Sequence, residues 1–261
     1  MRSSPRRRVR SFNYIDVTVM SIASNLAAVH QEIIAACARV QREPGEITLV
    51  AASKGHPIDA MREYLAAAKT LGIPPVFGES YVQEAKSKVA ALSSEAEFHL
   101  MGPLQSNKVR DAVALFDVIQ SVHTTKVLSL ISKEAVKSGK VQRVLLQINI
   151  SRDPNKSGFA PEEVGSVLDE ALSLPGVAVE GIMAITAIYD DSESVRSDFR
   201  ALRSIAGTVH GRVNEIVRGT YVAAAVVSMG MSGDYGIAIE EGSSMVRIGT
   251  AIFGERDYPA R

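Results

Sequence analysis

The sequence predicts a (β/α)8 barrel, a TIM barrel of the α/β class, from three observations that agree. Short runs of β-branched and other apolar residues alternate with longer amphipathic stretches from residue 47 almost to the C-terminus. The chain has 261 residues, a length that one barrel uses as a single unit. Its composition is 46% hydrophobic but only 5% aromatic, which is typical of strands covered by helices.

The predicted strands number eight, as a closed barrel requires. They occupy residues 47–53, 75–80, 98–102, 116–122, 143–151, 177–185, 223–230 and 244–254. Apolar residues recur at helical spacing from Ile22 to Val40, and further helical patterns cover residues 57–72, 81–92, 124–139, 161–176 and 192–211. An open doubly wound sheet is the alternative, but no G-x-G-x-x-G fingerprint follows the first strand.

The domain assignment follows from these elements. Residues 21–261 form one barrel domain, and residues 1–20 form a disordered tail that begins with the basic stretch "MRSSPRRRVRS". An organelle transit peptide and an early start codon are alternatives for this tail. In the rest of the chain no long linker or internal repeat divides the sequence.

Charge and cysteine content exclude several classes of function. Lys plus Arg and Asp plus Glu each total 29, so the charge balance gives no reason to expect nucleic acid or an acidic membrane as a partner. No apolar run approaches the roughly 20 residues of a membrane span. Cys37 is the only cysteine, which excludes an internal disulfide and fits a reducing compartment such as the cytoplasm. The expected ligand is a small molecule.

Lys54 is the first candidate for chemistry, in the stretch "LVAASKGHP" (residues 49–57). It directly follows the first strand, and active groups of such barrels gather at the C-terminal ends of strands. Apolar walls disfavour a charged lysine, so its amine becomes nucleophilic toward carbonyl groups. From position alone, a solvated lysine in an ordinary loop is the favoured alternative.

A candidate anion site lies near the other end of the chain, in "SMGMSGD" (residues 228–234) and "VRIGTAIFG" (residues 246–254). Loops after the seventh and eighth strands of barrels frequently bind phosphate. Small residues and hydroxyls are concentrated in these two stretches: Gly230, Gly233, Gly249, Ser228, Ser232 and Thr250. Ordinary turn chemistry explains them equally well.

Arg247 strengthens the case for a ligand. Side chains alternate along a strand, so Arg247 faces the barrel interior if Val246 and Ile248 pack against helices. A buried arginine needs hydrogen-bond acceptors, either a carboxylate from residues 239–242 or a ligand's ring nitrogen or phosphate. Pyridoxal 5'-phosphate accounts for all these signals at once, with a Schiff base on Lys54 and Arg247 near the pyridine nitrogen.

A family resemblance rests on motifs that span residues 22–256. In order they are "LVAASK", "FGESYVQEAKSK", "FHLMGPLQSNKVR", "QSVHT", "LLQINIS", "KSGF", "EGIMAI", "SMGMSGD" and "MVRIGTAIFGER". They resemble the YggS/PROSC family of proteins that bind pyridoxal phosphate.

The resemblance implies a barrel like the N-terminal domain of alanine racemase. This barrel is known as fold type III among enzymes that use pyridoxal phosphate. The same resemblance implies that the cofactor is held on Lys54, with Arg247 at the ring nitrogen and Ser228, Met229, Gly249 and Thr250 at the phosphate. It also implies a role in vitamin B6 and amino-acid homeostasis without an established reaction, a monomer, and cofactor-dependent apoenzymes as recipients.

Some positions depart from the family pattern or carry weaker predictions. Ser80 stands where the family motif "GENYVQE" has asparagine, and the segment before it looks longer than usual. Ser80 in the second strand, His99 in the third and Asn149 in the fifth are further cofactor candidates, although a packing role for His99 is favoured. The histidines show no pair at metal-ligand spacing, so we expect no metal.

Binding without robust catalysis is the favoured function, and an enzyme is the alternative. Only a few residues follow the eighth strand, so we expect no second domain of the kind that gives racemases an acid/base tyrosine. An arginine at the pyridine nitrogen disfavours protonation of the ring and weakens it as an electron sink. A small racemase or lyase, and a cofactor-free barrel enzyme acting on phosphorylated sugars, remain alternatives.

Overall fold

The computed structural model describes residues 21–216 and 225–255. The predicted tail, residues 1–20, lies outside the described residues, as do the first two residues of the predicted strand 223–230. The rest of each predicted strand and helix can be compared with the structure.

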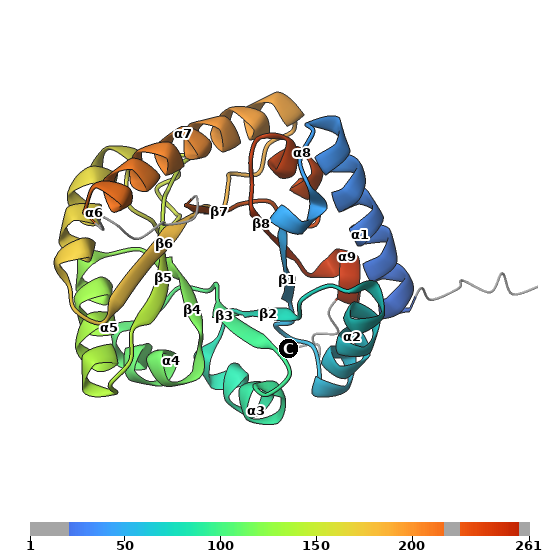
Figure 1. The fold of residues 1–261 in the computed structure, drawn as a ribbon, viewed down its shortest axis with the longest axis horizontal. Coiled ribbons are helices and arrows are strands. Elements are labelled where there is room, and N and C mark those ends of the chain that lie inside the picture. Colours follow the sequence, from blue (N-terminus) through green and yellow to red (C-terminus); the bar gives the residue numbers. More distant parts are fainter. Residues whose placement is uncertain (1–20, 217–224, 256–261) are drawn as a thin grey trace, which may run out of the picture.

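Eight parallel strands close into a barrel in chain order, as the sequence predicts (Figure 1). They are β1 (Thr48–Ala52), β2 (Val76–Glu79), β3 (Glu97–Leu100), β4 (Val118–Val122), β5 (Gln142–Gln147), β6 (Val177–Met183), β7 (Val226–Ser228) and β8 (Met245–Ile248). The first strand pairs with the last, from Thr48 opposite Met245 to Ala51 opposite Ile248. The open-sheet alternative is therefore wrong.

Helices surround the barrel on its outer side (Figure 1). They are α1 (Ile22–Arg39), α2 (Ile58–Leu71), α3 (Val82–Leu92), α4 (Val109–Leu115), α5 (Thr125–Lys137), α6 (Val164–Ser173), α7 (Ser192–Ile216), α8 (Tyr235–Glu240) and α9 (Thr250–Phe253), with 3-10 turns η1 (Pro44–Glu46), η2 (Ser106–Lys108) and η3 (Pro161–Glu163). Each predicted helix is present, with shifted ends. The sequence did not predict α4, α8 and α9, which are short.

Two predicted strands extend furthest past the observed ends. The eighth was expected to reach residue 254, but β8 ends at Ile248 and the apolar run after Gly249 is helix α9, whose Ile252 is buried. Periodicity cannot separate a strand from a helix in so short an apolar run. The fifth was expected to reach residue 151, but β5 ends at Gln147 and only an isolated bridge at Ile148 follows.

The side chains of the strands alternate between two hydrophobic layers. The outer layer lies between strands and helices and includes Val246, Ile248 and Cys37 of α1. The inner layer fills the barrel with aliphatic side chains: Val50, Val76, Val118, Leu145, Met183 and Met245. Since Met245 faces inward and Val246 faces outward, Arg247 faces inward, as the alternation predicts.

Among the helices of the two described ranges, none is both long enough and apolar enough to cross a membrane.

Candidate ligand pocket at the barrel mouth

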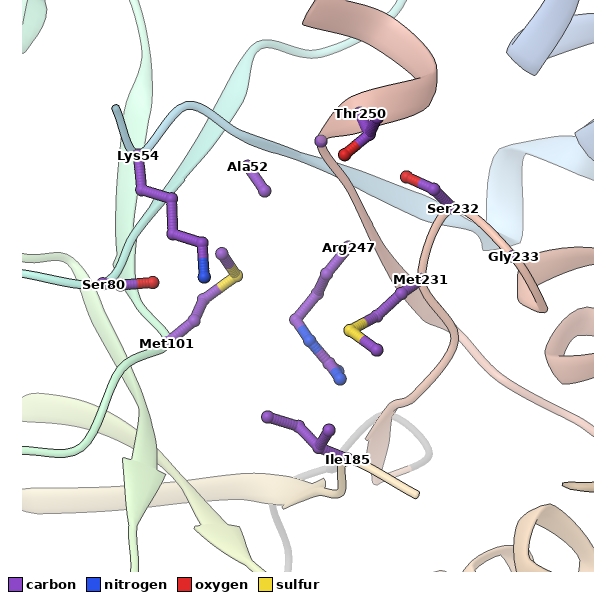
Figure 2. Close-up of a pocket in the computed structure, with 11 residues that line it drawn as sticks. Ala52, Lys54, Ser80, Met101, Ile185, Met231, Ser232, Gly233, Arg247 and Thr250 are labelled. Carbon is purple, nitrogen blue, oxygen red and sulfur yellow. The ribbon is translucent and has the colours of Figure 1, made fainter. Parts of the chain in front are cut away.

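A pocket of about 330 Å³ opens at the C-terminal ends of the strands (Figure 2). This is the end of the barrel where the sequence predicts chemistry. The residues that line it are Ala52, Lys54, Ser80, Met101, Ile185, Met231, Ser232, Gly233, Arg247, Gly249 and Thr250. It therefore joins Lys54, from the start of the chain, to the two small-residue loops near the end.

Lys54 lies in a sharp turn after β1, and its side chain extends into the pocket toward Met101 (Figure 2). Gly55 follows it with a φ of 77°, a left-handed conformation that favours glycine. The backbone on both sides of Lys54 is fixed by side chains. The Ser53 carbonyl accepts from Lys88 Nζ at 2.8 Å, and the Gly55 amide donates to Glu84 Oε1 at 2.7 Å.

An ion cluster of the buried Glu79 and Lys88 with the partly exposed Glu84 supplies these contacts. Lys88 Nζ donates to Glu79 Oε1 at 2.8 Å and to Glu84 Oε1 at 2.6 Å, and the Ser53 hydroxyl donates to Glu79 Oε1 at 2.6 Å. Glu79 is fully buried and Lys88 nearly so. Burial raises the pKa of Glu79, and the opposing effects of Lys88 and Ser53 do not cancel it.

Arg247 forms the opposite wall, and its guanidinium group is held directly. Nη1 donates to Ser228 Oγ at 2.7 Å and Nη2 donates to the Ala184 carbonyl at 2.8 Å. Burial lowers the pKa of Arg247 to about 10. The group is therefore still a cation at neutral pH, facing a largely apolar pocket.

Of the two alternatives for the partner of Arg247, the carboxylate from residues 239–242 is wrong. Glu240 pairs with Arg39 and Arg196, and Glu241 pairs with Arg196 and Arg200. These ion pairs join α8 to α1 and α7 outside the barrel. The acceptors inside it are a neutral hydroxyl and a carbonyl.

Hydroxyl groups and glycines gather at one side of the pocket. The hydroxyls of Ser232 and Thr250 lie at the same side of the pocket in Figure 2, and Gly233 and Gly249 line the same region. A Cβ added at Gly249 would lie 3.1 Å from the Ala52 carbonyl oxygen, so glycine permits close packing of the two strand ends. These groups are of the type that binds phosphate in barrels.

Two of the predicted phosphate residues lie elsewhere. Ser228 and Met229 are fully buried and do not line the pocket. The side chain of Ser228 faces the barrel interior and that of Met229 packs in the outer layer. The motif "SMGMSGD" does reach the pocket, but through Ser232 and Gly233. β7 ends at Ser228, two residues before the predicted end, and the chain lines the pocket only from Met231 onward.

The weaker candidates divide. Ser80 lines the pocket. His99 is 1% exposed and is hydrogen-bonded to Glu97 and Gln120, which agrees with the packing role favoured for it. Asn149 closes the loop after β5, where its Nδ2 donates to the Asp153 carbonyl at 2.8 Å.

Sequence reasoning missed the apolar part of the pocket, which consists of Ala52, Met101, Ile185 and Met231. Single apolar residues carry no chemical signal, and only their position at the end of β1 or just after β3, β6 and β7 could have indicated them. Across the described ranges, no group of three His, Cys, Asp or Glu side chains is placed to hold a metal ion.

Comparison with known proteins identifies the family to which this chain belongs. The model of the alanine racemase N-terminal domain matches residues 25–257. A pyridoxal phosphate homeostasis protein of Vibrio alginolyticus is 36% identical over 91% of this chain and 99% of its own, and one of Escherichia coli K12 is 38% identical over 91% and 97%. The chain belongs to the pyridoxal phosphate homeostasis protein family.

Solved structures agree with this family and its barrel. PipY of Synechococcus elongatus with pyridoxal phosphate bound is 31% identical, with a TM-score of 0.74 over 90% of this chain and 100% of its own. Alanine racemase of Corynebacterium glutamicum is 16% identical, with a TM-score of 0.66 over 92% of this chain and 62% of its own. The second likeness concerns the fold alone. The barrel is thus that of an alanine racemase N-terminal domain.

Proposed function

We propose that this protein binds pyridoxal 5'-phosphate at the barrel mouth and serves vitamin B6 and amino-acid homeostasis in the cytoplasm, without robust catalysis. The observation that carries the proposal is the joining of Lys54, Arg247 and a hydroxyl-lined end in one pocket. Family members named for pyridoxal phosphate homeostasis, and PipY with the cofactor bound, support it.

The pocket residues fit the functional groups of this cofactor. The cofactor supplies an aldehyde, with which a neutral lysine amine forms a Schiff base and releases water. Lys54 is the lysine of the pocket and is assigned to the aldehyde. Ser232, Gly233, Gly249 and Thr250 are assigned to the phosphate, and Arg247 to the pyridine nitrogen on the opposite wall.

The residues that line the pocket favour binding of the cofactor over catalytic turnover of a substrate. Apart from Lys54 and Arg247, the residues that line the pocket in the described chain have no titratable side chain. Racemisation needs a proton donor and acceptor on each face of the substrate carbon, and Lys54 serves only one face. Arg247 is a permanent cation and disfavours a second positive charge on the ring.

The route of the cofactor is part of the proposal. A monomer that delivers the cofactor to apoenzymes needs an open binding site, and this pocket opens at the barrel mouth. A buried, free Cys37 fits a reducing compartment.

Titration with pyridoxal phosphate tests the role of Lys54. The protein should develop a visible absorbance band of the imine that Lys54→Ala lacks. Lys86→Ala is the matched control, because Lys86 lies on the outer side of α3 and is paired with Asp111 at 2.7 Å. An unchanged band in Lys54→Ala would contradict the proposal.

A fold type III enzyme, an amino-acid racemase or lyase, is the alternative function, which the racemase-like barrel favours. It predicts repeated exchange of the α-proton of an amino acid in deuterated water, lost in Lys54→Ala. The proposal predicts no such turnover beyond a trace.

A further inference from the structure

A chain of hydrogen-bonded side chains crosses the barrel interior beneath the pocket. From Arg247 Nη1 it runs to Ser228 Oγ at 2.7 Å, and from that hydroxyl to Gln120 Oε1 at 2.7 Å. Gln120 Nε2 then meets His99 Nδ1 at 2.7 Å, and His99 Nε2 meets Glu97 Oε1 at 2.9 Å. We call these five residues the interior chain. It connects the pocket to the N-terminal end of β3.

The interior chain is buried over most of its length. Ser228 and Gln120 are fully buried, and His99 and Arg247 are 1% and 5% exposed. Around Gln120 and His99 the barrel is filled by apolar side chains, among them Met245, whose sulfur lies 3.2 Å from Gln120 Nε2. Buried polar groups are costly when unpaired, so each link depends on its neighbours.

The far end is a partly exposed ion pair. Glu97 Oε1 also accepts from Arg143 Nη1 at 2.7 Å, and Arg143 Nε donates to Glu180 at 2.5 Å. The Glu97 side chain is 34% exposed. The hydrogen bonds from His99 and Arg143 favour the charged form of Glu97. Glu97 is therefore a carboxylate that only accepts.

The chemistry of the two ends and the orientation of the Gln120 amide together set the direction of every link. A guanidinium only donates and a carboxylate only accepts. Ser228 therefore accepts from Arg247 and donates to Gln120 Oε1, which leaves the amide nitrogen facing His99 Nδ1. Nδ1 must accept, so His99 is a neutral imidazole with its proton on Nε2. A doubly protonated His99 would turn the amide of Gln120 and leave the Ser228 hydroxyl proton without its acceptor.

We propose that Ser228, Gln120, His99 and Glu97 are positioning residues for Arg247. Ser228 accepts a hydrogen bond from Arg247 Nη1, and the other three residues hold Ser228 in place, which fixes the orientation of the guanidinium group. The N–H groups of Arg247 that do not bond to the protein are then directed at the ligand ring. This inference rests on the proposed function, in which Arg247 meets the pyridine nitrogen. None of the four residues touches the pocket, so their effect on the ligand passes through Arg247.

The first test needs no cofactor. In protein with 15N-labelled histidine at neutral pH, His99 should give the 15N pattern of the neutral Nε2–H form, and Gln120→Leu should shift its Nδ1 signal. An imidazolium or an Nδ1–H tautomer would overturn the direction of the chain. This result stands or falls separately from cofactor binding.

The second test measures the loaded protein. Gln120→Leu should shift the visible band of bound pyridoxal phosphate and weaken its binding about tenfold, the equivalent of one hydrogen bond to a charged group. Gln142→Leu is the matched control, because Gln142 is an equally buried glutamine on β5 that bonds only to carbonyl groups. It should leave both readouts unchanged.

The outcomes separate the inference from the proposed function. If the wild-type protein fails to take up pyridoxal phosphate, both the proposed function and this inference are contradicted. The histidine spectrum still tests the hydrogen-bond directions of the interior chain in that case. If Gln120→Leu shifts the His99 signal but keeps the wild-type band and affinity, the positioning role is overturned.

A variant at the exposed end covers the case in which Gln120→Leu does not fold. Glu97→Gln should fold, since Glu97 is one-third exposed, and should shift the visible band in the same direction as Gln120→Leu by a smaller amount. A Glu97→Gln band identical to that of the wild type would contradict the proposal.

Discussion

The two walls of the pocket hold their functional side chains in different ways. On the β1 wall, the ion cluster of Glu79, Lys88 and Glu84 acts on the backbone around Lys54. On the β8 wall, neutral groups act on the guanidinium of Arg247 itself. In the proposed function a lysine has to lose a proton and form a bond, whereas an arginine has to remain a fixed cation. The protein fixes the turn in one case and the functional group in the other.

The two walls also differ in the charge of the side chains that they bury. The β1 wall buries a lysine beside a carboxylate, an arrangement in which removal of one partner leaves the other charged and desolvated. The β8 wall places a hydroxyl, an amide and an imidazole between Arg247 and the distant Glu97. The walls should therefore respond differently to the loss of one side chain.

The largest expected effect is that of Lys88→Met on the β1 wall. Loss of the ammonium leaves Glu79 without its buried partner, and the free energy of unfolding should fall by about 3–5 kcal/mol. Lys86→Met removes a lysine from the same helix, but its pair with Asp111 is 44% and 40% exposed, so the loss should stay below about 1 kcal/mol. Urea denaturation measures both, and equal losses would contradict the account.

A smaller effect is expected for Ser228→Ala on the β8 wall. The substitution leaves Gln120 Oε1 and Arg247 Nη1 buried without their partner, at a cost of about 1–3 kcal/mol. Ser132→Ala is the matched control, because the Ser132 hydroxyl donates to a single carbonyl, that of Pro175. The same denaturation experiment should find the loss at Ser228 to be the greater.

The pH dependence of stability should have opposite signs at the two carboxylates. The pKa of Glu97 is about 2 against an ordinary 4.5, so the unfolded chain binds more protons between these values, and the stability from Glu97 is lost as pH falls through them. The pKa of Glu79 is raised, so above 4.5 the folded chain binds more protons and stability falls as pH rises. Melting temperature against pH measures both effects.

Single substitutions assign each slope to its residue. Glu97→Gln should flatten the acid side of the profile and leave the other side in place, and Glu79→Gln should do the reverse. A profile that neither substitution changes would show that other groups control the pH dependence.

The fold and the two ends of the pocket could be predicted from the sequence because both depend on local signals. The strands follow from apolar periodicity, and Lys54, Gly249 and Thr250 follow from polar or small residues at strand ends. Arg247 could be placed inside the barrel from the alternation along β8. These inferences need only the chain near each residue.

The remaining features depend on contacts between distant segments. The links from Ser53 to Glu79 and Lys88 and the link from Gln120 to Ser228 join residues that have no recognisable spacing in the sequence. Ser228, which the family resemblance implies at the phosphate, lies within the interior chain because its side chain points into the barrel from the end of β7.

The most direct measurement is the site of covalent attachment after the protein is loaded with pyridoxal phosphate and reduced with borohydride. Peptide mapping by mass spectrometry should find the phosphopyridoxyl group on Lys54. The same result is expected for the wild-type protein and for the Lys86→Ala control. Attachment at another lysine with an unmodified Lys54 would contradict the account.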